Sequence, residues 1–334
     1  MMFNDGAIVK RRPIIAVVVG GESGEHEISL KSGTEVLAGI DLDLWAPFVV
    51  RIERSGGWCF PPQIQSLAPV MGVGDGVNAL LERDPDLVFP VMHGPYGEDG
   101  RFQALMELLH LDYVGSDSES SALAMHKARA RVILAAAGLA VPPGQELCVG
   151  EELLISAPCV VKPMRLGSSV GLAVVKTEDL LKASLEEAFS HDPYVLVEQF
   201  VEGREFTAGV LEDEDGKPLA LPIIEIQPKT SEFFDYHAKY TPGATDEICP
   251  APIEDTLRDE LQRIGLVAHK ALGCHGMSRT DMIVDPAGKA WVLETNTIPG
   301  MTKTSLLPLA AREAGISFTE MINCLLSRAL KSRR

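Results

Sequence analysis

The sequence has 334 residues and carries 30 lysines and arginines against 47 aspartates and glutamates, which gives a net charge of −17. This acidic balance argues against a general nucleic-acid-binding protein, because neutralising phosphates requires a basic surface. The apolar run 14–19 is far shorter than the roughly 18 residues that cross a bilayer, so no membrane segment is expected. At roughly 150 residues per domain, the length predicts about two domains, or three small ones.

The cysteines indicate a reducing compartment. None of the six cysteines stands in a CxxC pair, so the sequence supports neither a zinc site nor a thioredoxin-like motif. The basic residues 10–12 and the short apolar run after them lack the cleavage site of an export signal. We therefore expect reduced thiols and a cytoplasmic location.

The first third of the chain alternates between strand and helix patterns. The fully apolar run 14–19 is typical of a strand that is covered on both faces of a parallel sheet. A predicted helix has Phe102, Leu105, Leu108 and Leu109 on its apolar stripe. This alternation predicts an α/β layer structure. The expected elements are strands 14–19, 45–52 and 86–92 and helices 29–40 and 101–111.

The remainder of the chain has a different mixture of elements. One long helix is expected over 118–138, where a serine or aspartate caps the start and Gly138 suits the end. Residues 167–171 are predicted to form a turn between two strands, and the polar stretch 227–250 is irregular. The other expected elements are strands 159–162, 171–176, 194–199, 205–211 and 219–226, helices 178–190 and 255–272, a hairpin within 279–296, and two C-terminal helices.

The hairpin carries the strongest local signal for chemistry. Residues 285–288 form a tight-turn motif, so Asp281 and Glu294 fall almost opposite each other on its two strands. Two carboxylates at this separation repel unless a cation or a proton lies between them. Asn296 adds a third oxygen, and three such ligands suit Mg²⁺. The alternative is a solvated hairpin with incidental acids.

A glycine- and serine-rich turn follows the apolar strand that ends in Lys162. Glycines let backbone N–H groups approach phosphate oxygens, and the serines of 167–171 add donors. The Walker A spacing is absent, and a plain hairpin turn is the alternative. Lys162 itself is unusual, because a lysine in a buried strand requires an anion.

Three other loops contain candidate ligand-binding residues. Residues 20–27 follow the first strand but lack the GxGxxG spacing, and their glutamates suit an ammonium group better than a pyrophosphate. His93 opens a second glycine-rich loop, in which Glu98 and Asp99 would cap the helix that follows. Lys239-Tyr240 would lie on a lid over bound phosphates, or on an ordinary exposed loop.

Together these segments resemble the D-alanine–D-alanine ligases of the ATP-grasp superfamily, over nearly the whole chain. One such segment alone is weak evidence, but eight in the right order are specific. The segments are GGESGEHEISL (20–30), HGPYGEDGRFQ (93–103), YVGSDSESSALAMHK (113–127), VVKPMRLGSSVG (160–171), EQFVEGREFT (198–207), DYHAKY (235–240), RTDMIVD (279–285) and LETNTIPGMTKTSL (293–306).

The resemblance implies that ATP phosphorylates the carboxylate of one D-alanine, and that the amine of a second D-alanine then displaces phosphate. Glu198 matches the acid that receives the adenine amino group, and Glu205 the acid at the ribose. The implied ATP-binding residues are Lys127, Lys162, Ser168, Ser169, Glu198, Glu205 and Lys239, and the implied ligands of two Mg²⁺ or Mn²⁺ ions are Asp281, Glu294 and Asn296.

The resemblance also assigns residues to the amino acids. Glu25 matches the carboxylate that holds the first ammonium group, and His93 lies at the same subsite. Arg279 and the backbone N–H of Gly300 match the oxyanion donors, a role with large catalytic weight. Ser305 matches the contact to the second carboxylate.

Two more residues bear on the second substrate. Tyr240 matches a lid tyrosine that connects through Ser168 to Glu25, and it favours an amine over D-lactate. Leu306 adjoins Ser305 and is assigned to the substrate pocket. The open alternative is a ligase that joins D-alanine to D-serine or D-lactate. A non-enzymatic nucleotide-binding regulator would lack the metal and oxyanion residues, which are present.

The implied architecture is an ATP-grasp fold that combines α/β and α+β parts. An N-terminal parallel-sheet α/β domain for substrate (1–126) precedes a central ATP-binding domain (127–202) and a C-terminal catalytic domain (203–334). The implied partners are D-alanine and ATP, with no nucleic acid and no membrane, and the implied assembly is a homodimer.

Overall fold

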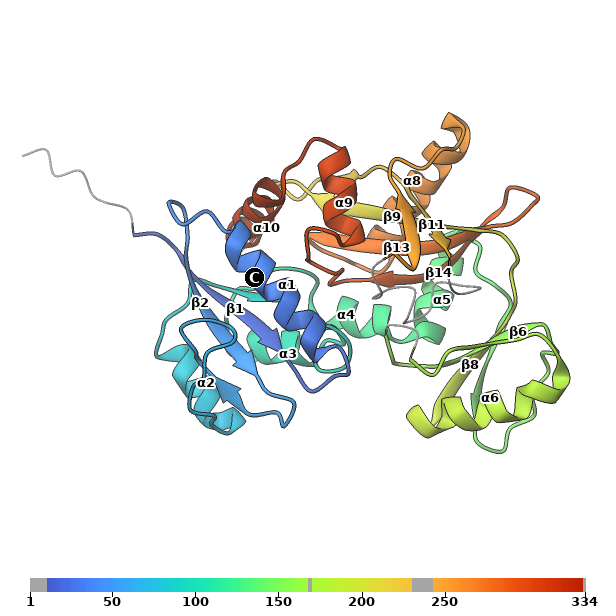
Figure 1. Ribbon diagram of the computed structural model, residues 1–334, viewed down its shortest axis with the longest axis horizontal. Coiled ribbons are helices and arrows are strands. Elements are labelled where there is room, and N and C mark those ends of the chain that lie inside the picture. Colours follow the sequence, from blue (N-terminus) through green and yellow to red (C-terminus); the bar gives the residue numbers. More distant parts are fainter. Residues whose placement is uncertain (1–10, 168–169, 230–242, 333–334) are drawn as a thin grey trace, which may run out of the picture.

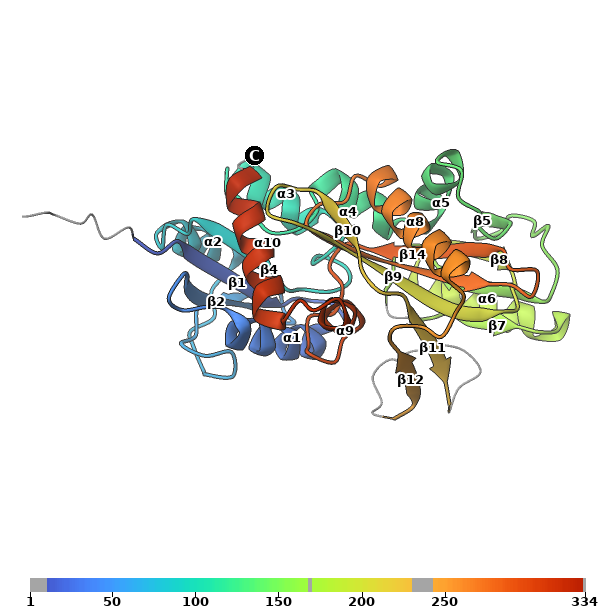
Figure 2. The same cartoon turned by 90° about the horizontal axis from the view of Figure 1, so that it is seen from above.

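The computed structural model describes residues 11–167, 170–229 and 243–332, and it arranges them around three β-sheets (Figures 1 and 2). In Figure 1 the N-terminal sheet, in blue, and the central sheet, in yellow-green, lie toward opposite ends of the molecule. The C-terminal sheet, whose strands run from yellow (β9) to red-orange (β14), lies toward the top of that view. None of the described helices is long and apolar enough to cross a membrane.

The N-terminal sheet has the strand order β3-β2-β1-β4, with β1 parallel to both of its neighbours. Ile15, Val17 and Val19 of β1 pack into one core cluster, and Ala16 and Val18 into another. Both faces of β1 are therefore buried, as its continuous apolar run predicts. The elements are β1 (Ile14–Gly20), α1 (His26–Gly39), β2 (Ala46–Ile52), β3 (Trp58–Cys59), α2 (Val73–Leu81), β4 (Leu87–Pro90) and α3 (Arg101–Leu108).

The predicted apolar stripe of α3 is wrong at one position. Leu108 is 79% exposed, whereas Met106 is fully buried beside Phe102. At 100° per residue, Leu108 lies about 240° around the helix from Phe102, while residue 106 lies only about 40° away. The stripe therefore continues through Met106 to Leu109.

The predicted helix 118–138 is two helices, α4 (Ser118–Met125) and α5 (Lys127–Ala136). The expected ends are confirmed, because the Asp117 side chain accepts from the Ser120 N–H and Gly138 has a φ of +84°. The break is at His126, whose ψ of 92° is extended. It lets the Lys127 N–H donate to the Met164 carbonyl at 3.3 Å, so a tertiary contact replaces a helical one.

The central sheet is antiparallel, with the order β5-β8-β6-β7, and α6 covers one of its faces (Figure 1). Leu147, Val161, Val195 and Val197 form its buried core together with Ala188 of α6. The elements are β5 (Gly144–Cys148), β6 (Cys159–Pro163), β7 (Ala173–Val175), α6 (Glu178–His191) and β8 (Tyr194–Gln199).

The C-terminal sheet has the order β12-β11-β9-β13-β14, and β10 also pairs with β9. The predicted strand 219–226 is two strands, β10 and β11, because Pro222 between them has no N–H to donate to a ladder. The elements are β9 (Arg204–Glu212), β10 (Pro218–Ala220), β11 (Ile224–Pro228), β12 (Thr245–Ile248), α8 (Asp255–Ala271), β13 (Met277–Val284), β14 (Ala290–Asn296), α9 (Leu306–Glu313) and α10 (Phe318–Ser332).

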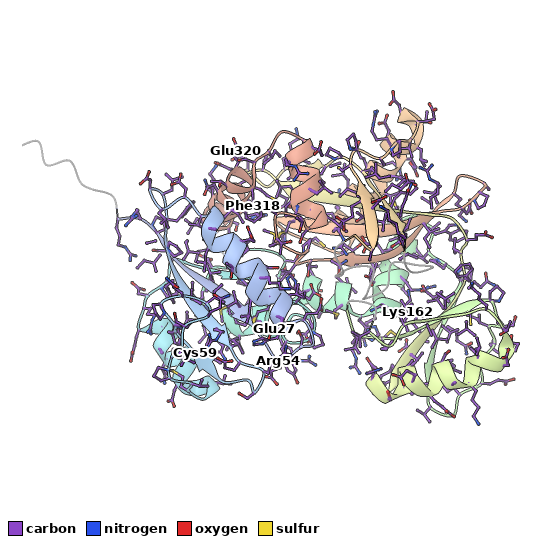
Figure 3. The ribbon with its side chains drawn as sticks, viewed as in Figure 1. Glu27, Arg54, Cys59, Lys162, Phe318 and Glu320 are labelled. Atoms are coloured by element: carbon purple, nitrogen blue, oxygen red, sulfur yellow. The ribbon has the colours of Figure 1, made fainter. Side chains whose placement is uncertain are left out.

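Helix α10 connects the C-terminal part of the chain to the N-terminal sheet. A Cβ added to Gly39 would lie 2.8 Å from the Phe318 ring, so the start of α10 packs directly on the end of α1 (Figure 3). One core cluster includes residues of β1, β4, α9 and α10. We propose the three domains 1–126, 127–202 and 203–334 on the basis of the three sheets, with α10 packed on the first.

A buried polar network lies where β9 ends, at Glu212, and just before β13 begins, at Gly276. The Glu212 carboxylate accepts the Gly276 N–H at 2.7 Å, pairs with Arg328 of α10, and lies 3.3 Å from His269 Nε2 of α8. Burial opposes ionisation, but these hydrogen bonds and the Arg328 charge lower the pKa of Glu212 to about 2.

Replacing Glu212 with alanine should lower the free energy of unfolding by about 3–5 kcal/mol, because His269 and Arg328 lose a buried partner. The stabilisation by Glu212 is present above its ordinary pKa of 4.5 and is lost as the pH falls from 4.5 toward 2. Urea denaturation measures both effects. Glu214→Ala removes only an exposed ion pair with Lys331 at 3.0 Å and should cost less than about 1 kcal/mol. Equal losses in the two variants would contradict the prediction.

Candidate active site

The β13–β14 hairpin places the two predicted carboxylates opposite each other, because Asp281 pairs with Glu294 in the register. The turn at Asp285 is as predicted, with the Gly288 N–H bonded to the Asp285 carbonyl at 2.9 Å. The register shifts after Asp281, so that Met282 pairs with Val292 and one extra residue of β14 bulges. Leu293 and Glu294 consequently line the same cleft.

Asp281 lies at the centre of a hydrogen-bonded group. Its side chain, 6% exposed, accepts two bonds from the Arg279 guanidinium, at 2.9 and 2.8 Å. Thr207 Oγ1 donates to it at 2.6 Å, and Asn296 Nδ2 lies 3.5 Å away. The structure therefore brings together Arg279 and the three predicted metal ligands.

The donor set of this group fits a hard divalent cation. It offers two carboxylates and the amide oxygen of Asn296, and oxygen is the donor that Mg²⁺ and Mn²⁺ prefer. Among the described residues, no three histidine, cysteine, aspartate or glutamate side chains form a metal-binding group.

A cleft runs between the central sheet and the β13–β14 hairpin. Both predicted phosphate lysines, Lys127 and Lys162, line it together with Glu198 and Glu205. Lys162 lies on the part of β6 that faces the C-terminal sheet (Figure 3). Apolar side chains from both sheets form the remaining walls: Val160, Leu172, Val174, Phe200, Ile283 and Leu293.

The two lysines have different partners. Lys127, the first residue of α5, donates to the Leu166 carbonyl at 2.5 Å and lies 4.0 Å from Glu294 Oε2. Lys162 forms a buried ion pair with Glu198 Oε2, so the expected anion is present. Lys127 is thus next to the proposed metal ligand Glu294, whereas Lys162 is next to Glu198.

A larger cavity of about 900 Å³ lies on the other side of residues 164–166. Its walls come from the loop after β4, from α4 and α5, and from Tyr194. None of the predicted site residues that the structure describes lines this cavity. The described residues that were predicted to bind ATP all line the narrower cleft instead: Lys127, Lys162, Glu198 and Glu205.

The N-terminal domain contributes a buried cluster around Glu25, which is 8% exposed. His93 is buried nearby, with Nε2 3.3 Å from Ser32 Oγ and Nδ1 3.1 Å from the Ile298 carbonyl. Burial lowers the pKa of His93, although the charge of Glu25 opposes this shift. A Cβ added to Gly167 would lie 3.2 Å from Glu25 Oε2, so the loop after β6 reaches this cluster.

Glu98 belongs to this site and was assigned only a capping role by the sequence. Asp99, which precedes the N-cap residue Gly100, accepts the N–H of Arg101, the first residue of α3, at 3.2 Å. Glu98 is instead 6% exposed and accepts the Gly94 N–H at 3.1 Å. It lines a small cavity together with Lys127 and Glu294. Burial, and then the charge of Glu25, raise the pKa of Glu98 to about 8.

Replacing Glu98 with glutamine should stabilise the protein more at pH 8 than at pH 5. The native state keeps the Glu98 proton up to about pH 8, whereas the ordinary pKa is 4.5, so native stability falls as the pH rises between these values. The gain should reach up to about 4 kcal/mol. Urea denaturation at both pH values measures it, with exposed Glu186→Gln as control. A gain independent of pH would contradict the prediction.

Gly300 and Ser305 lie next to each other, because a Cβ on Gly300 would be 2.8 Å from Ser305 Oγ. Ser305 precedes α9 and its hydroxyl lies 2.7 Å from Thr302 Oγ1. The Leu306 side chain is 6% exposed and packs in the core, so a contact with substrate would have to use its backbone N–H. The predictions for Ser168, Ser169, Lys239 and Tyr240 fall outside the described residues.

Comparison with known proteins identifies the family. The models for the N-terminus and C-terminus of D-Ala–D-Ala ligases match residues 14–72, 74–116 and 142–327. The D-alanine–D-alanine ligase of Citrifermentans bemidjiense is 42% identical over 317 residues, covering 94% of this chain and 95% of its own length. That of Geotalea uraniireducens is 40% identical over 320 residues, with the same coverage of 94% and 95%.

Solved structures agree with this assignment. The D-alanine–D-alanine ligase of Coxiella burnetii superimposes with a TM-score of 0.81 at 30% identity, covering 96% of this chain and 95% of its own. The VanG D-Ala:D-Ser ligase of Enterococcus faecalis has a TM-score of 0.80 at 32% identity, covering 96% and 100%. The α/β architecture of three sheets is therefore the ATP-grasp fold, and the chain belongs to the D-alanine–D-alanine ligase family.

Proposed function

We propose that the chain catalyses ATP + 2 D-alanine → D-alanyl-D-alanine + ADP + phosphate, for peptidoglycan precursor synthesis. The observation that carries this proposal is the pairing of Asp281 with Glu294 in one cleft with Lys127 and Lys162. The two carboxylates suit a metal ion and the two lysines suit phosphate oxygens. The metal ion and the lysines together would offset the negative charge of a triphosphate. The buried Glu25 cluster supplies the complementary site for an ammonium group.

Each step of the reaction has residues suited to it. Glu25 would hold the ammonium group of the first D-alanine, with His93 beside it. Arg279 and the Gly300 N–H would donate to the developing oxyanion, where such donors lower the barrier most. Ser305 would bind the second carboxylate, directly or through the adjoining Leu306 N–H.

The nucleotide would lie along the cleft. Lys127 and Lys162 would contact its phosphates, and Glu198 and Glu205 its base and ribose, with Ser168, Ser169 and Lys239 completing the set as expected from the family. Asp281, Glu294 and Asn296 would hold Mg²⁺ or Mn²⁺, as two ions, which stabilise the negative charge that develops on the transferred phosphoryl group. We also propose that Tyr240 and Ser168 complete the closed site.

A D-serine-adding ligase is the second candidate, favoured by the 32% identity to a D-Ala:D-Ser ligase. The relatives at 40–42% identity named above are D-alanine–D-alanine ligases, which favours the dipeptide of D-alanine. Near Ser305, Lys303 pairs with Glu35 of α1 at 3.4 Å.

A phosphate-release assay with ATP, Mg²⁺ and D-alanine tests the proposal, with mass spectrometry of the product. We expect D-alanyl-D-alanine as the main product, and little phosphate release when D-serine or D-lactate is offered with limiting D-alanine. A mixed dipeptide or depsipeptide as the main product would favour the second candidate. We further propose a homodimer located in the cytoplasm, where ATP is available.

A further inference from the structure

A buried cluster of three charges lies at one end of the cleft. Arg131 of α5 pairs with Glu198 Oε1, and Lys162 pairs with Glu198 Oε2. The Glu198 side chain is 2% exposed, Lys162 8% and Arg131 11%. One buried carboxylate thus has two cations, although a single partner would neutralise it and each additional buried charge costs desolvation free energy.

The two cations differ in how firmly they are held. Arg131 also donates to the Pro142 carbonyl, and Gly144 lies against its guanidinium. A Cβ on Gly144 would be 2.8 Å from Arg131 Nη1, and Gly144 is the residue opposite Glu198 in the β5–β8 register. The planar guanidinium is therefore fixed in place, whereas Lys162 has a flexible stem with three rotatable donors.

The residues that line the cleft determine which part of a bound nucleotide would contact Glu198. Besides the Glu198 cluster, the cleft contains a second charged group, the acidic pair with Lys127, and apolar side chains of both sheets line its remaining walls. A purine triphosphate would therefore place its base against the apolar walls near Glu198 and its phosphates toward Lys127. An ionised carboxylate only accepts hydrogen bonds, so it favours an amino group and repels a carbonyl oxygen on the base edge.

We propose that Arg131 is a positioning residue that makes the nucleotide site selective for a 6-aminopurine over a 6-oxopurine. This inference rests on the proposed ATP-dependent function. Lys162 is the exchangeable partner of Glu198, because the lysine side chain turns to the phosphates when nucleotide binds. Arg131 then remains as the one charged partner among the described residues that keeps Glu198 ionised and correctly oriented.

The test compares ATP with inosine triphosphate, which has a carbonyl oxygen in place of the 6-amino group. In Arg131→Met the ratio of ATP to inosine triphosphate affinity, measured by calorimetry with Mg²⁺, should fall about tenfold or more, because Glu198 loses its charged partner. In steady-state assays the KM for ATP should rise, while kcat and the KM for D-alanine change little. Arg131→Lys should restore part of the selectivity.

Two further variants separate positioning from folding. Gly144→Ala keeps the arginine but displaces its guanidinium, so it should lower the same ratio. Arg129→Met changes an exposed arginine on the same helix that lines the other cavity, and it should leave the ratio unchanged. Wild-type selectivity in all three variants, Arg131→Met, Arg131→Lys and Gly144→Ala, would overturn the inference. If Arg131→Met does not fold, wild-type selectivity in both of the other two variants would overturn it. Absence of dipeptide synthesis by the wild type would instead refute the proposed function, and the calorimetric ratio would still test Arg131.

Discussion

Replacing Arg279 with alanine is expected to lower kcat by a factor on the order of 10² to 10³, the loss typical of removing one oxyanion donor. The Arg279 side chain is 14% exposed and is held by two hydrogen bonds to Asp281, at 2.9 and 2.8 Å. Its guanidinium is therefore already oriented beside Asp281, which lines the cleft, before substrate binds. Because this interaction would form only in the transition state, kcat and kcat/KM should fall together.

The control for Arg279 is a second arginine of the same sheet. Arg204 bonds to Glu225 with the same forked geometry, at 2.8 Å for both hydrogen bonds, but Glu225, unlike Asp281, does not line the cleft. Arg204→Ala should change stability without a comparable change in kcat. Arg279→Lys keeps the charge but loses the fork, so it should recover only part of the rate. Turnover of Arg279→Ala within a few-fold of the wild type would refute its role.

The hairpin at the centre of the site could be predicted from sequence because its signals are local. A four-residue turn sets the register near it, in which Met282 pairs with Val292, so the local signals place Asp281 within one residue of Glu294. Continued without interruption, this register would pair Asp281 with Leu293, and the bulge moves Glu294 into that position. Alternation alone did not predict the bulge after Asp281. A bulge depends on how the partner strand packs, and here it brings Leu293 into the cleft beside Glu294.

Other features depend on contacts between distant parts of the chain. The break at His126 interrupts a segment with uniform helical propensity, and its reason is the contact of Lys127 with Met164. Arg131 lies 67 residues from Glu198, and no local pattern predicts that pair. Glu98 was similarly read as a helix cap, because its burial beside the Glu25 cluster is created only by the packing of two loops.

Replacing Glu294 with glutamine should lower activity without lowering stability. The change keeps the size of the side chain and one oxygen but removes its charge. The rate should fall on the order of 10²-fold, and the Mg²⁺ concentration for half-maximal activity should rise at least about tenfold, because a bound metal supplies several kcal/mol of transition-state stabilisation. Titration of the phosphate-release rate with Mg²⁺ measures both effects.

The stability of Glu294→Gln should not fall with its activity, and this difference distinguishes a metal ligand from a structural residue. Glu294 and Asp281 are opposed carboxylates, and like charges in this position repel. Without Mg²⁺, Glu294→Gln should therefore unfold at a temperature at least as high as the wild type. Added Mg²⁺ and ATP should raise the unfolding temperature of the wild type more than that of the variant. Exposed Glu186→Gln should behave as the wild type throughout. A variant that keeps the wild-type dependence on Mg²⁺, in both activity and unfolding temperature, would show that Glu294 does not bind the metal.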